Sequence, residues 1–272
     1  MPLYQVIVLS IVQGVTELLP ISSSGHLFLT SWLLGWQDEG LAFDIALHLG
    51  TLFAVIVYFF RDWLQVIAQG FGVNFGTDEH LKQNPRLLWM LAAASLPIGL
   101  LGLKFKDAAE TSLRSPWVIG TMLIAVGLLM WLGEKMGSRA KNMGQVTWLD
   151  AMLIGVGQSL AIIPGTSRSG ITMTTALFRN LDRAAAARFS FLLSTPAVAA
   201  AGLKAVYDAV KTEGASALLT QELFIGIVLS GVTGWAVIAF LMRYLQRSSL
   251  LPFIWYRIGF GILVIALAVF RA

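Results

Sequence analysis

The sequence contains no cysteine and few charged residues. Without cysteine, neither a disulfide nor a thiolate metal site can form. Charged residues make up 12% of the chain and hydrophobic residues 57%, whereas a soluble domain carries roughly 25% charged residues. The net charge of +4 is small, and Lys and Arg are scattered instead of forming the basic stripe that nucleic acid requires. The composition therefore predicts an integral membrane protein with no nucleic-acid partner.

Long apolar runs divide the chain into candidate membrane spans. A spanning helix needs about 20 mostly apolar residues. The stretches that meet this requirement are residues 41–60, 86–104, 117–134, 184–207, 222–243 and 251–270. The more polar stretch 61–85 has room for a short surface helix. We therefore expect an all-α protein with six transmembrane helices.

Two further apolar regions, residues 3–34 and 148–178, are interrupted by polar loops. The loops read LPISSSGH at 19–26 and IPGTSRSG at 163–170, and each flanking half is too short to span a bilayer alone. Non-helical backbone inside a membrane is tolerated only where protein buries it or where it lines a wet cavity. We therefore predict two re-entrant helix–loop–helix hairpins.

The order of elements indicates an internal repeat, because a hairpin followed by three spans occurs twice. The residues that coincide when the sequence is shifted by 145 are Gln13 with Gln158, Ser22 with Ser167, Ser24 with Ser169, and Gly25 with Gly170. We predict one membrane domain built from halves of about 1–135 and 148–272. Three spans per half invert the second half relative to the first, which places a site near the bilayer midplane.

The loops opposite the N-terminus carry more Lys and Arg than those on its own side. Positive residues concentrate on the cytoplasmic side of membrane proteins. We therefore expect both termini, 1 and 272, to lie outside the cytoplasm.

Gln13 and Glu17 are polar residues within the first interrupted apolar region. An ionisable group at the centre of a membrane costs about 3 kcal/mol, so its presence indicates a functional site. Because the two residues are four apart, they share one helix face. The alternative is that Glu17 is protonated or reaches the membrane surface.

The first loop ends in SSSGH, residues 22–26, and opens a helix. Serine is a common N-cap, and a helix N-terminus binds anions through its free N–H groups and its dipole. A cap alone needs one serine, so we interpret four residues as a candidate anion cradle, namely Ser22, Ser23, Ser24 and Gly25. His26 is a candidate general acid or base, whereas His48 and His80 are interpreted as structural.

The second loop reads PGTSRSGIT, residues 164–172, and also opens a helix. Arg168 lies within it, and a buried guanidinium flanked by hydroxyls and glycines suits phosphate. The candidate phosphate-binding residues beside it are Ser167, Ser169, Gly170 and Thr172. The alternative is an ion pair between Arg168 and Glu17 without a ligand.

Together the two loops offer a carboxylate, an imidazole, a guanidinium and several hydroxyls. This set suits phosphoryl transfer, in which positioning and charge stabilisation provide most of the catalysis. A serine can attack phosphorus while His26 or Glu17 takes its proton. The three serines of the first loop, and water, are all candidate nucleophiles.

At these residues the chain resembles the bacterial undecaprenyl-diphosphate phosphatases, the bacitracin-resistance family. The resemblance rests on Gln13-x-x-x-Glu17, PISSSGH (20–26) and PGTSRSGIT (164–172), and the span pattern agrees along essentially the whole chain. It implies a multi-pass enzyme of the bacterial cytoplasmic membrane with a site open to the external face. Such an enzyme removes the terminal phosphate from a C55 polyprenyl diphosphate. It thereby recycles the lipid carrier for cell-wall synthesis and confers bacitracin resistance.

The resemblance also implies catalytic roles for Glu17, Ser23, His26 and Arg168, with Ser23 favoured as the nucleophile. A divalent cation, Mg²⁺ or Ca²⁺, is expected with Glu17 as a ligand, because hard cations prefer oxygen. The family carries Glu or Gln where this chain has Gln13, so a mechanism that needs a carboxylate pair is in doubt. The oligomeric state stays open, with a homodimer as one option.

Two alternatives remain at this stage. A polyprenyl-phosphate transporter or flippase would use broken helices and the same anion site without cleaving its substrate. An intramembrane serine protease would need serine, histidine and an oxyanion hole, but it gives Arg168 no role.

Overall fold

The computed structural model describes residues 1–37, 41–214 and 220–271. Within these ranges the chain is helical with no β-strand, which confirms the predicted all-α class. The α-helices are α1 (Leu3–Leu18), α2 (Ser23–Leu34), α3 (Leu41–Tyr58), α4 (Phe60–Gly70), α5 (Glu79–Lys82), α6 (Leu87–Glu110), α7 (Pro116–Met136), α8 (Trp148–Gln158), α9 (Arg168–Phe178), α10 (Arg183–Glu213), α11 (Gln221–Leu245) and α12 (Leu251–Arg271). Short 3₁₀ turns, η1 (Met143–Gln145) and η2 (Ser159–Ile162), precede and follow α8.

Five of the described helices, α6, α7, α10, α11 and α12, are long and apolar enough to cross a membrane. They correspond to five of the predicted spans. The remaining predicted span, 41–60, lies on α3, which is followed after Phe59 by a 72° bend into α4. The predicted number of six is reached when this bent pair counts as one span. Helices α4 and α5 occupy the stretch where a short surface helix was expected.

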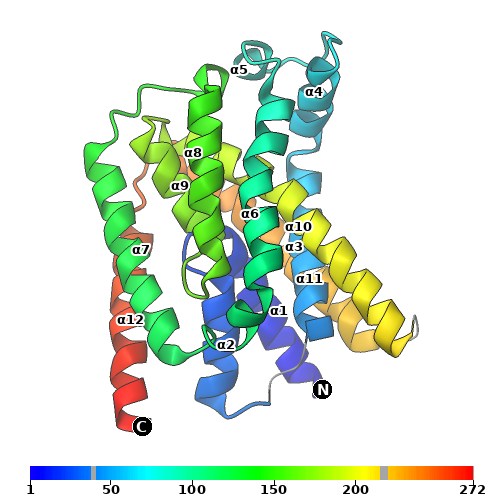
Figure 1. Ribbon diagram of the computed structural model, residues 1–272, viewed down its shortest axis with the longest axis vertical. Coiled ribbons are helices and arrows are strands. Elements are labelled where there is room, and N and C mark those ends of the chain that lie inside the picture. Colours follow the sequence, from blue (N-terminus) through cyan, green and yellow to red (C-terminus); the bar gives the residue numbers. More distant parts are fainter. Residues whose placement is uncertain (38–40, 215–219, 272) are drawn as a thin grey trace.

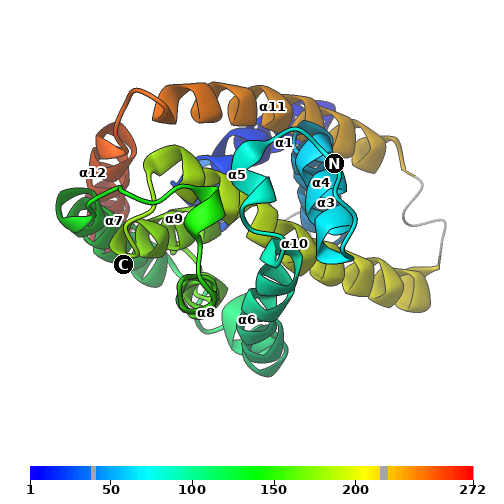
Figure 2. The same cartoon turned by 90° about the horizontal axis from the view of Figure 1, so that it is seen from above.

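The two interrupted regions form helix pairs that lie in opposite halves of the molecule. Figure 1 shows α1 and α2 in the lower half, on the side of both chain ends, and α8 and α9 in the upper half, towards α4 and α5. Seen from above in Figure 2, α7 and α12 lie together at one edge, and α11 runs along one side next to α1. The loop between α1 and α2 and the loop before α9 therefore enter the molecule from opposite ends.

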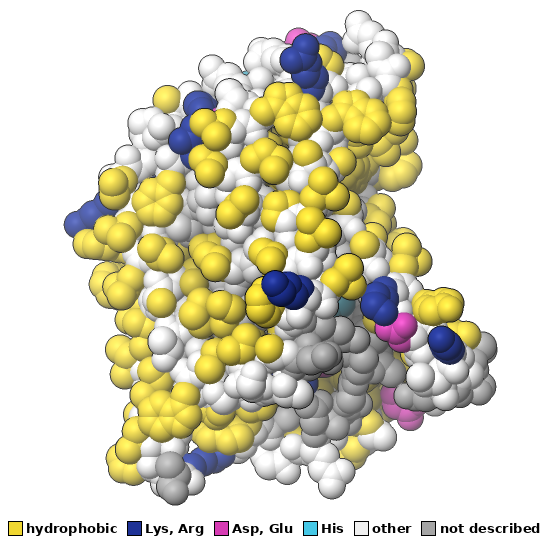
Figure 3. Space-filling model, in the orientation of Figure 1, with side chains coloured by type: hydrophobic (Ala, Val, Ile, Leu, Met, Phe, Trp, Pro, Cys, Tyr) yellow, Lys and Arg dark blue, Asp and Glu magenta, His cyan; other side chains and the backbone are white. Residues whose placement is uncertain are grey.

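Glycines allow two long helix pairs to approach closely. On α7, a Cβ atom added to Gly120 would lie 3.1 Å from the carbonyl oxygen of Gly261 on α12. On α11, a Cβ added to Gly231 would lie 3.1 Å from the carbonyl oxygen of Gly50 on α3. Small residues at such crossings provide close packing, which holds helices together in lipid. Apolar side chains cover most of the face shown in Figure 3, as expected for a protein surrounded by lipid.

Glu134 joins three helices near the end of α7. Its residue is 5% exposed, and its carboxylate accepts hydrogen bonds from Arg183 at 2.8 Å, Arg139 at 2.8 Å and the Leu250 backbone N–H at 2.7 Å. Removing one partner of a buried ion pair leaves the other charge without compensation. This carboxylate therefore ties α7 to the starts of α10 and α12.

We expect Glu134→Ala to lower the free energy of unfolding by about 3 kcal/mol, measured by titration with SDS in mixed micelles. The matched control is Glu79→Ala, because the Glu79 side chain is 75% exposed and pairs only with Lys82. That variant should change the free energy by less than about 0.5 kcal/mol. Equal stability of the two variants would contradict the role given to Glu134.

Candidate active site

Each of the two polar loops ends in a serine with an unusual backbone. Ser22 precedes α2 with a φ of 79°, and Ser167 precedes α9 with a φ of 68°. Positive φ values are uncommon for residues other than glycine, and such strain often accompanies functional sites. In each loop this serine lies near the hydroxyl two residues on, with Oγ–Oγ distances of 3.5 Å to Ser24 and 3.2 Å to Ser169. The two loops therefore share one local geometry.

The structure brings these loops into direct contact. The Ser169 hydroxyl donates to the carbonyl oxygens of Leu19, at 3.1 Å, and of Glu17, at 3.4 Å. A Cβ added to Gly25 would lie 3.7 Å from the Cα of Gly165. Residues about 150 positions apart in the sequence thus form one polar centre.

The Glu17 carboxylate lies at the middle of this centre, with its side chain 8% exposed. Its Oε1 atom accepts a hydrogen bond from the Arg168 guanidinium, and its Oε2 atom accepts one from the Ser23 hydroxyl. Gln13 Nε2 also donates to Oε2, at 3.3 Å. Three predicted site residues, Gln13, Ser23 and Arg168, therefore donate to the Glu17 carboxylate, and the Glu17–Arg168 ion pair that the sequence left as an alternative is present.

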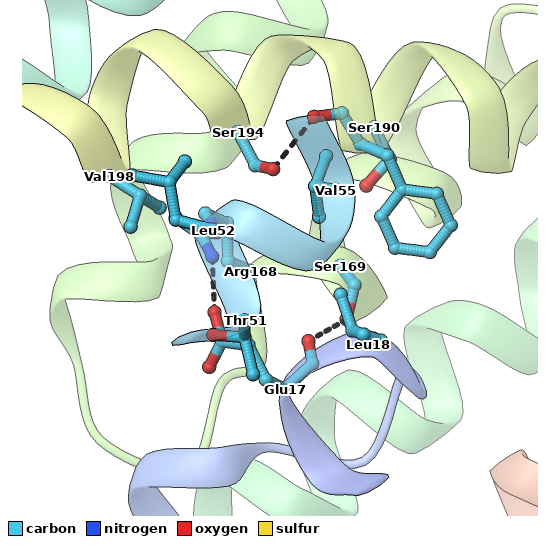
Figure 4. Close-up of a pocket in the computed structure, with 11 residues that line it drawn as sticks. Glu17, Leu18, Thr51, Leu52, Val55, Arg168, Ser169, Ser190, Ser194 and Val198 are labelled. Atoms are coloured by element: carbon cyan, nitrogen blue, oxygen red, sulfur yellow. Dashed lines mark hydrogen bonds and ion pairs between the residues drawn. The ribbon is translucent and has the colours of Figure 1, made fainter. Parts of the chain in front are cut away.

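A small cavity adjoins this ion pair (Figure 4). Its lining comes from α1, α3, α9 and α10, and Glu17 is the one carboxylate among the lining residues. Figure 4 shows Arg168 directed towards Glu17, with Thr51 beside them and Ser190 and Ser194 on the opposite wall. The cavity volume is about 10 Å³, which is enough for one water molecule. The space beside the Glu17–Arg168 ion pair is therefore too small for a phosphate group in this arrangement.

The predicted binding residues of the second loop are held by hydrogen bonds within the protein. Ser167 caps α9 by accepting from the Gly170 N–H at 3.1 Å. The Thr172 hydroxyl bonds to the Arg168 carbonyl at 2.7 Å and meets the Ser190 hydroxyl at 2.6 Å. The Gly170 N–H is consequently engaged by the cap, which fixes the start of α9 and the direction of Arg168.

His26 lies apart from the Glu17 carboxylate. Its Nδ1 atom is 2.7 Å from the Ser22 carbonyl oxygen, its Nε2 atom is 2.7 Å from the Tyr256 hydroxyl, and its ring stacks on Phe260 with centroids 4.8 Å apart. A neutral imidazole satisfies both contacts, with Nδ1 donating and Nε2 accepting. In this arrangement neither ring nitrogen is available to Ser23.

His48 occupies the place that the sequence suggested for His26. Its Nε2 atom lies 3.6 Å from Glu17 Oε2, and its Nδ1 atom is 2.7 Å from the Asp44 carbonyl oxygen. Sequence reasoning gave His48 a structural role because no motif surrounds it. It also passed over Arg257, which is completely buried on α12. Both residues are ionisable groups within predicted spans, and that criterion alone identifies them.

A second cavity, of about 360 Å³, lies at the other end of α3 and α10. Arg188 bridges two carboxylates there, Asp62 at 2.7 Å and Asp78 at 2.9 Å. Burial raises the pKa of the Asp78 carboxyl, but the Leu81 N–H and Arg188 together lower it below its usual value. This cluster ties the loop before α5 to α10.

The site suits a divalent cation only where the substrate provides most of the ligands. Among the described residues, no group of three His, Asp or Glu side chains could hold a metal ion. Glu17 is the one carboxylate at the cavity, and the buried Gln13 Oε1 atom has no hydrogen-bond partner. Mg²⁺ is commonly bound by one or two carboxylates together with substrate phosphates. One carboxylate and one unpaired amide oxygen fit that mode.

The fold and the site define a multi-pass membrane protein with a partly buried centre of serine, carboxylate and arginine. The sequence profile of the bacitracin resistance protein BacA family matches residues 6–263, and the chain belongs to this family. Proteins named undecaprenyl-diphosphatase from Gemmatimonas aurantiaca and Desulforudis audaxviator are each 46% identical to the chain over 98% of both lengths. One of the same name from Moorella thermoacetica is 43% identical, also over 98% of both chains. The chain is therefore a membrane-bound hydrolase of this family.

Proposed function

We propose that this protein hydrolyses undecaprenyl diphosphate to undecaprenyl phosphate and inorganic phosphate. The observation that carries the proposal is that Ser23 and Arg168 both donate to the Glu17 carboxylate at one partly buried point. A nucleophile, a proton acceptor and a phosphate-binding cation are the parts that phosphoryl transfer needs. The names of the relatives support the substrate, and no finding favours the transporter alternative.

Substrate binding begins with Arg168. Its guanidinium leaves Glu17 and takes phosphate oxygens, to which its fork of donors is matched. The hydroxyls of Ser22, Ser24 and Ser169 surround the terminal phosphate, and the C55 tail lies between helices and in lipid. Because Arg168 is paired with Glu17 beforehand, its charge is compensated in a poorly hydrated place until the phosphate arrives.

The chemical step starts at Ser23. Its hydroxyl donates to Glu17, so Glu17 is placed to take the proton as Ser23 Oγ bonds to the terminal phosphorus. The bond from that phosphorus to the bridging oxygen breaks, and undecaprenyl phosphate leaves. The leaving phosphate oxygen takes the proton from Glu17, which restores the carboxylate. Water then attacks the phosphoserine, Glu17 accepts a proton from that water and returns it to Ser23 Oγ, and inorganic phosphate leaves. His48 holds the position of the Glu17 carboxylate, and His26 holds the first loop against Tyr256 of α12.

We propose that Glu17 and the Gln13 amide oxygen hold a Mg²⁺ or Ca²⁺ ion together with the substrate diphosphate. When bound, such an ion neutralises charge on the diphosphate oxygens. Gln13 would then have two roles, because its Nε2 atom donates to Glu17 and its unpaired Oε1 atom would be available as a cation ligand.

In the cell, this activity recycles the carrier lipid for peptidoglycan synthesis and confers bacitracin resistance. We infer that the protein lies in the cytoplasmic membrane with both termini and the site on the external side, as the distribution of Lys and Arg indicates. We further infer an inverted repeat of two re-entrant hairpins. The matched backbones of Ser22 and Ser167 support a repeat, and the opposite placement of α1–α2 and α8–α9 in Figure 1 supports the inversion. A homodimer is compatible with this arrangement.

The deciding experiment measures phosphate release from undecaprenyl diphosphate by purified protein in detergent, where no transport is possible. Turnover with added Mg²⁺, and its loss in Arg168→Met, is the expected result. Arg243→Met, a change on α11 away from the lining residues, serves as the control and should retain activity. No release by the wild-type protein with either cation would refute the proposal.

Gln13→Glu tests the proposed cation site. A second carboxylate beside Glu17 adds a charged oxygen ligand, so we expect the Mg²⁺ concentration for half-maximal activity to fall by about tenfold. Direct binding of Mn²⁺ by the variant, followed by electron paramagnetic resonance, should tighten in parallel. Gln5→Glu, on the same helix one turn from the N-terminus, is the matched control. A Gln13→Glu variant with unchanged Mn²⁺ affinity would exclude Gln13 from the cation site.

A further inference from the structure

Arg257 lies in the middle of α12 and is completely buried. Its guanidinium donates hydrogen bonds to backbone carbonyls of both polar loops. Nη1 bonds to Pro20 at 3.0 Å, and Nη2 bonds to Gly165 at 3.0 Å and Thr166 at 2.8 Å. One side chain from a distant helix therefore connects the two halves of the candidate active site.

No described carboxylate forms an ion pair with this guanidinium. It also donates to two carbonyl oxygens on α7, those of Leu123 at 3.4 Å and Met122 at 3.5 Å. A buried charge is costly unless hydrogen bonds compensate it. Most of the hydrogen bonds that compensate the Arg257 charge come from carbonyl groups of the two loops. All of these bonds form only when both loops occupy their observed positions. The cost of burying Arg257 therefore favours the joined arrangement over any arrangement with separated loops.

Neighbouring residues of α12 hold the start of α2 as well. The Tyr256 hydroxyl bonds to His26, and Phe260 stacks on the same imidazole. On the other side, a Cβ added to Gly170 would lie 2.9 Å from Arg257 Nη1. The guanidinium consequently lies against the start of α9 while its neighbours hold α2.

We propose that Arg257 is a positioning residue that sets the register of the Ser23 loop against the Arg168 loop. Pro20 lies three residues before Ser23, and Thr166 lies two residues before Arg168. A guanidinium is planar and rigid. The carbonyl groups of Pro20 and Thr166, which Arg257 binds, are therefore held at a fixed separation. The nucleophile is thereby aligned with the group that binds the phosphate. The kinetic part of this inference rests on the proposed phosphatase function, whereas the structural part does not.

The kinetic test compares Arg257→Gln and Arg257→Lys with Arg271→Gln. Arg271 is the matched control, because it is on the same helix but is exposed and donates to one carbonyl, that of Trp32. We expect Arg257→Gln to lower kcat by about 100-fold, the effect of a small misplacement of reacting groups, while KM changes far less. Arg257→Lys keeps the charge but not the fork, so it should recover little of the loss. Arg271→Gln should match the wild-type protein.

The structural test uses the absence of native cysteine. Leu19→Cys and Ser169→Cys introduce a pair across the contact between the loops, where the Ser169 hydroxyl and the Leu19 carbonyl oxygen are 3.1 Å apart. A short bis-maleimide should link this pair rapidly in the otherwise wild-type protein and several-fold more slowly with Arg257→Gln. This readout is independent of phosphatase activity, so it still decides the inference if the proposed function is wrong.

Where Arg257→Gln gives a monodisperse protein, two results would overturn the proposal. One is rapid linking of the loops in Arg257→Gln together with a wild-type kcat. The other is full activity of Arg257→Lys, which would assign the effect to charge alone. Where Arg257→Gln does not give a monodisperse protein, linking the cysteine pair should restore monodispersity. Failure of that rescue would make Arg257 a general folding residue and would also overturn the proposal.

Discussion

Glu17→Gln should lower kcat for phosphate release by about 10³-fold, within the range measured for lost proton transfer and lost charge stabilisation. The glutamine keeps the shape of the side chain but cannot take the Ser23 proton. At saturating Mg²⁺, which offsets the loss of a cation ligand, KM should stay the same or fall. The reason is that Arg168 loses the carboxylate with which it is paired and becomes more available to phosphate. The expected signature is therefore a kcat defect without a binding defect.

Steady-state kinetics in detergent over a range of substrate concentrations would separate these parameters. Glu79→Gln is the control, because it removes an exposed carboxylate that pairs only with Lys82. A stability measurement on the same preparations would show whether the unpaired Arg168 destabilises the fold. If Glu17→Gln raised KM and left kcat unchanged, Glu17 would serve substrate binding and not the chemical step.

The apolar spans were predictable because their signal is local. Length and hydropathy alone place α7, α11 and α12 close to their observed bounds, whereas α6 and α10 continue beyond the predicted ends at 104 and 207, to Glu110 and Glu213. The bend after Phe59 was not predictable in the same way, because the apolar run continues through it to Phe60. The apolar run ends at Phe60, directly before Arg61 and Asp62. The chain therefore bends next to this charged pair, and α4 takes a direction different from that of α3.

The parts of the candidate site that lie close together in the sequence could be predicted to lie close together in space. Glu17 and Ser23 are close in both senses, and Arg168 was found because a cation inside a polar loop of an apolar region needs an explanation. The prediction for His26 relied on its position beside the serines. In the structure the His26 ring contacts Tyr256 instead. His48, which lies on α3, is the histidine beside Glu17.

Contacts between distant helices explain what the sequence could not provide. Arg257 contacts Pro20, from which it is separated by more than 200 residues in the sequence. No local sequence pattern predicts this contact. The same holds for Ser190, which reaches the second loop from α10 through Thr172. Motifs in the chain identified the two loops of the candidate site, whereas the helices that contact both loops became visible only in the packed structure.

Ser23→Ala should lower kcat by at least about 10³-fold, because removal of a nucleophile abolishes the covalent route. Among the serines of the first loop, Ser23 is the one with a hydroxyl bonded to Glu17, whereas Ser22 and Ser24 contact each other. Ser24→Ala should therefore cost only about tenfold, the effect of one lost hydrogen bond. Ser31→Ala, two turns further along α2, is the control and should remain fully active.

Rapid acid quenching with substrate labelled in its terminal phosphate tests the covalent step directly. Labelled protein should form in the wild type, with the label on Ser23, and it should be missing in Ser23→Ala. In Glu17→Gln, formation of the label should be slow, because the proton of Ser23 has no acceptor. If the wild type carried no label and Ser23→Ala kept more than a tenth of its activity, water would be the direct nucleophile. Glu17 would then activate that water, and the bond between Ser23 and Glu17 would serve to orient the carboxylate.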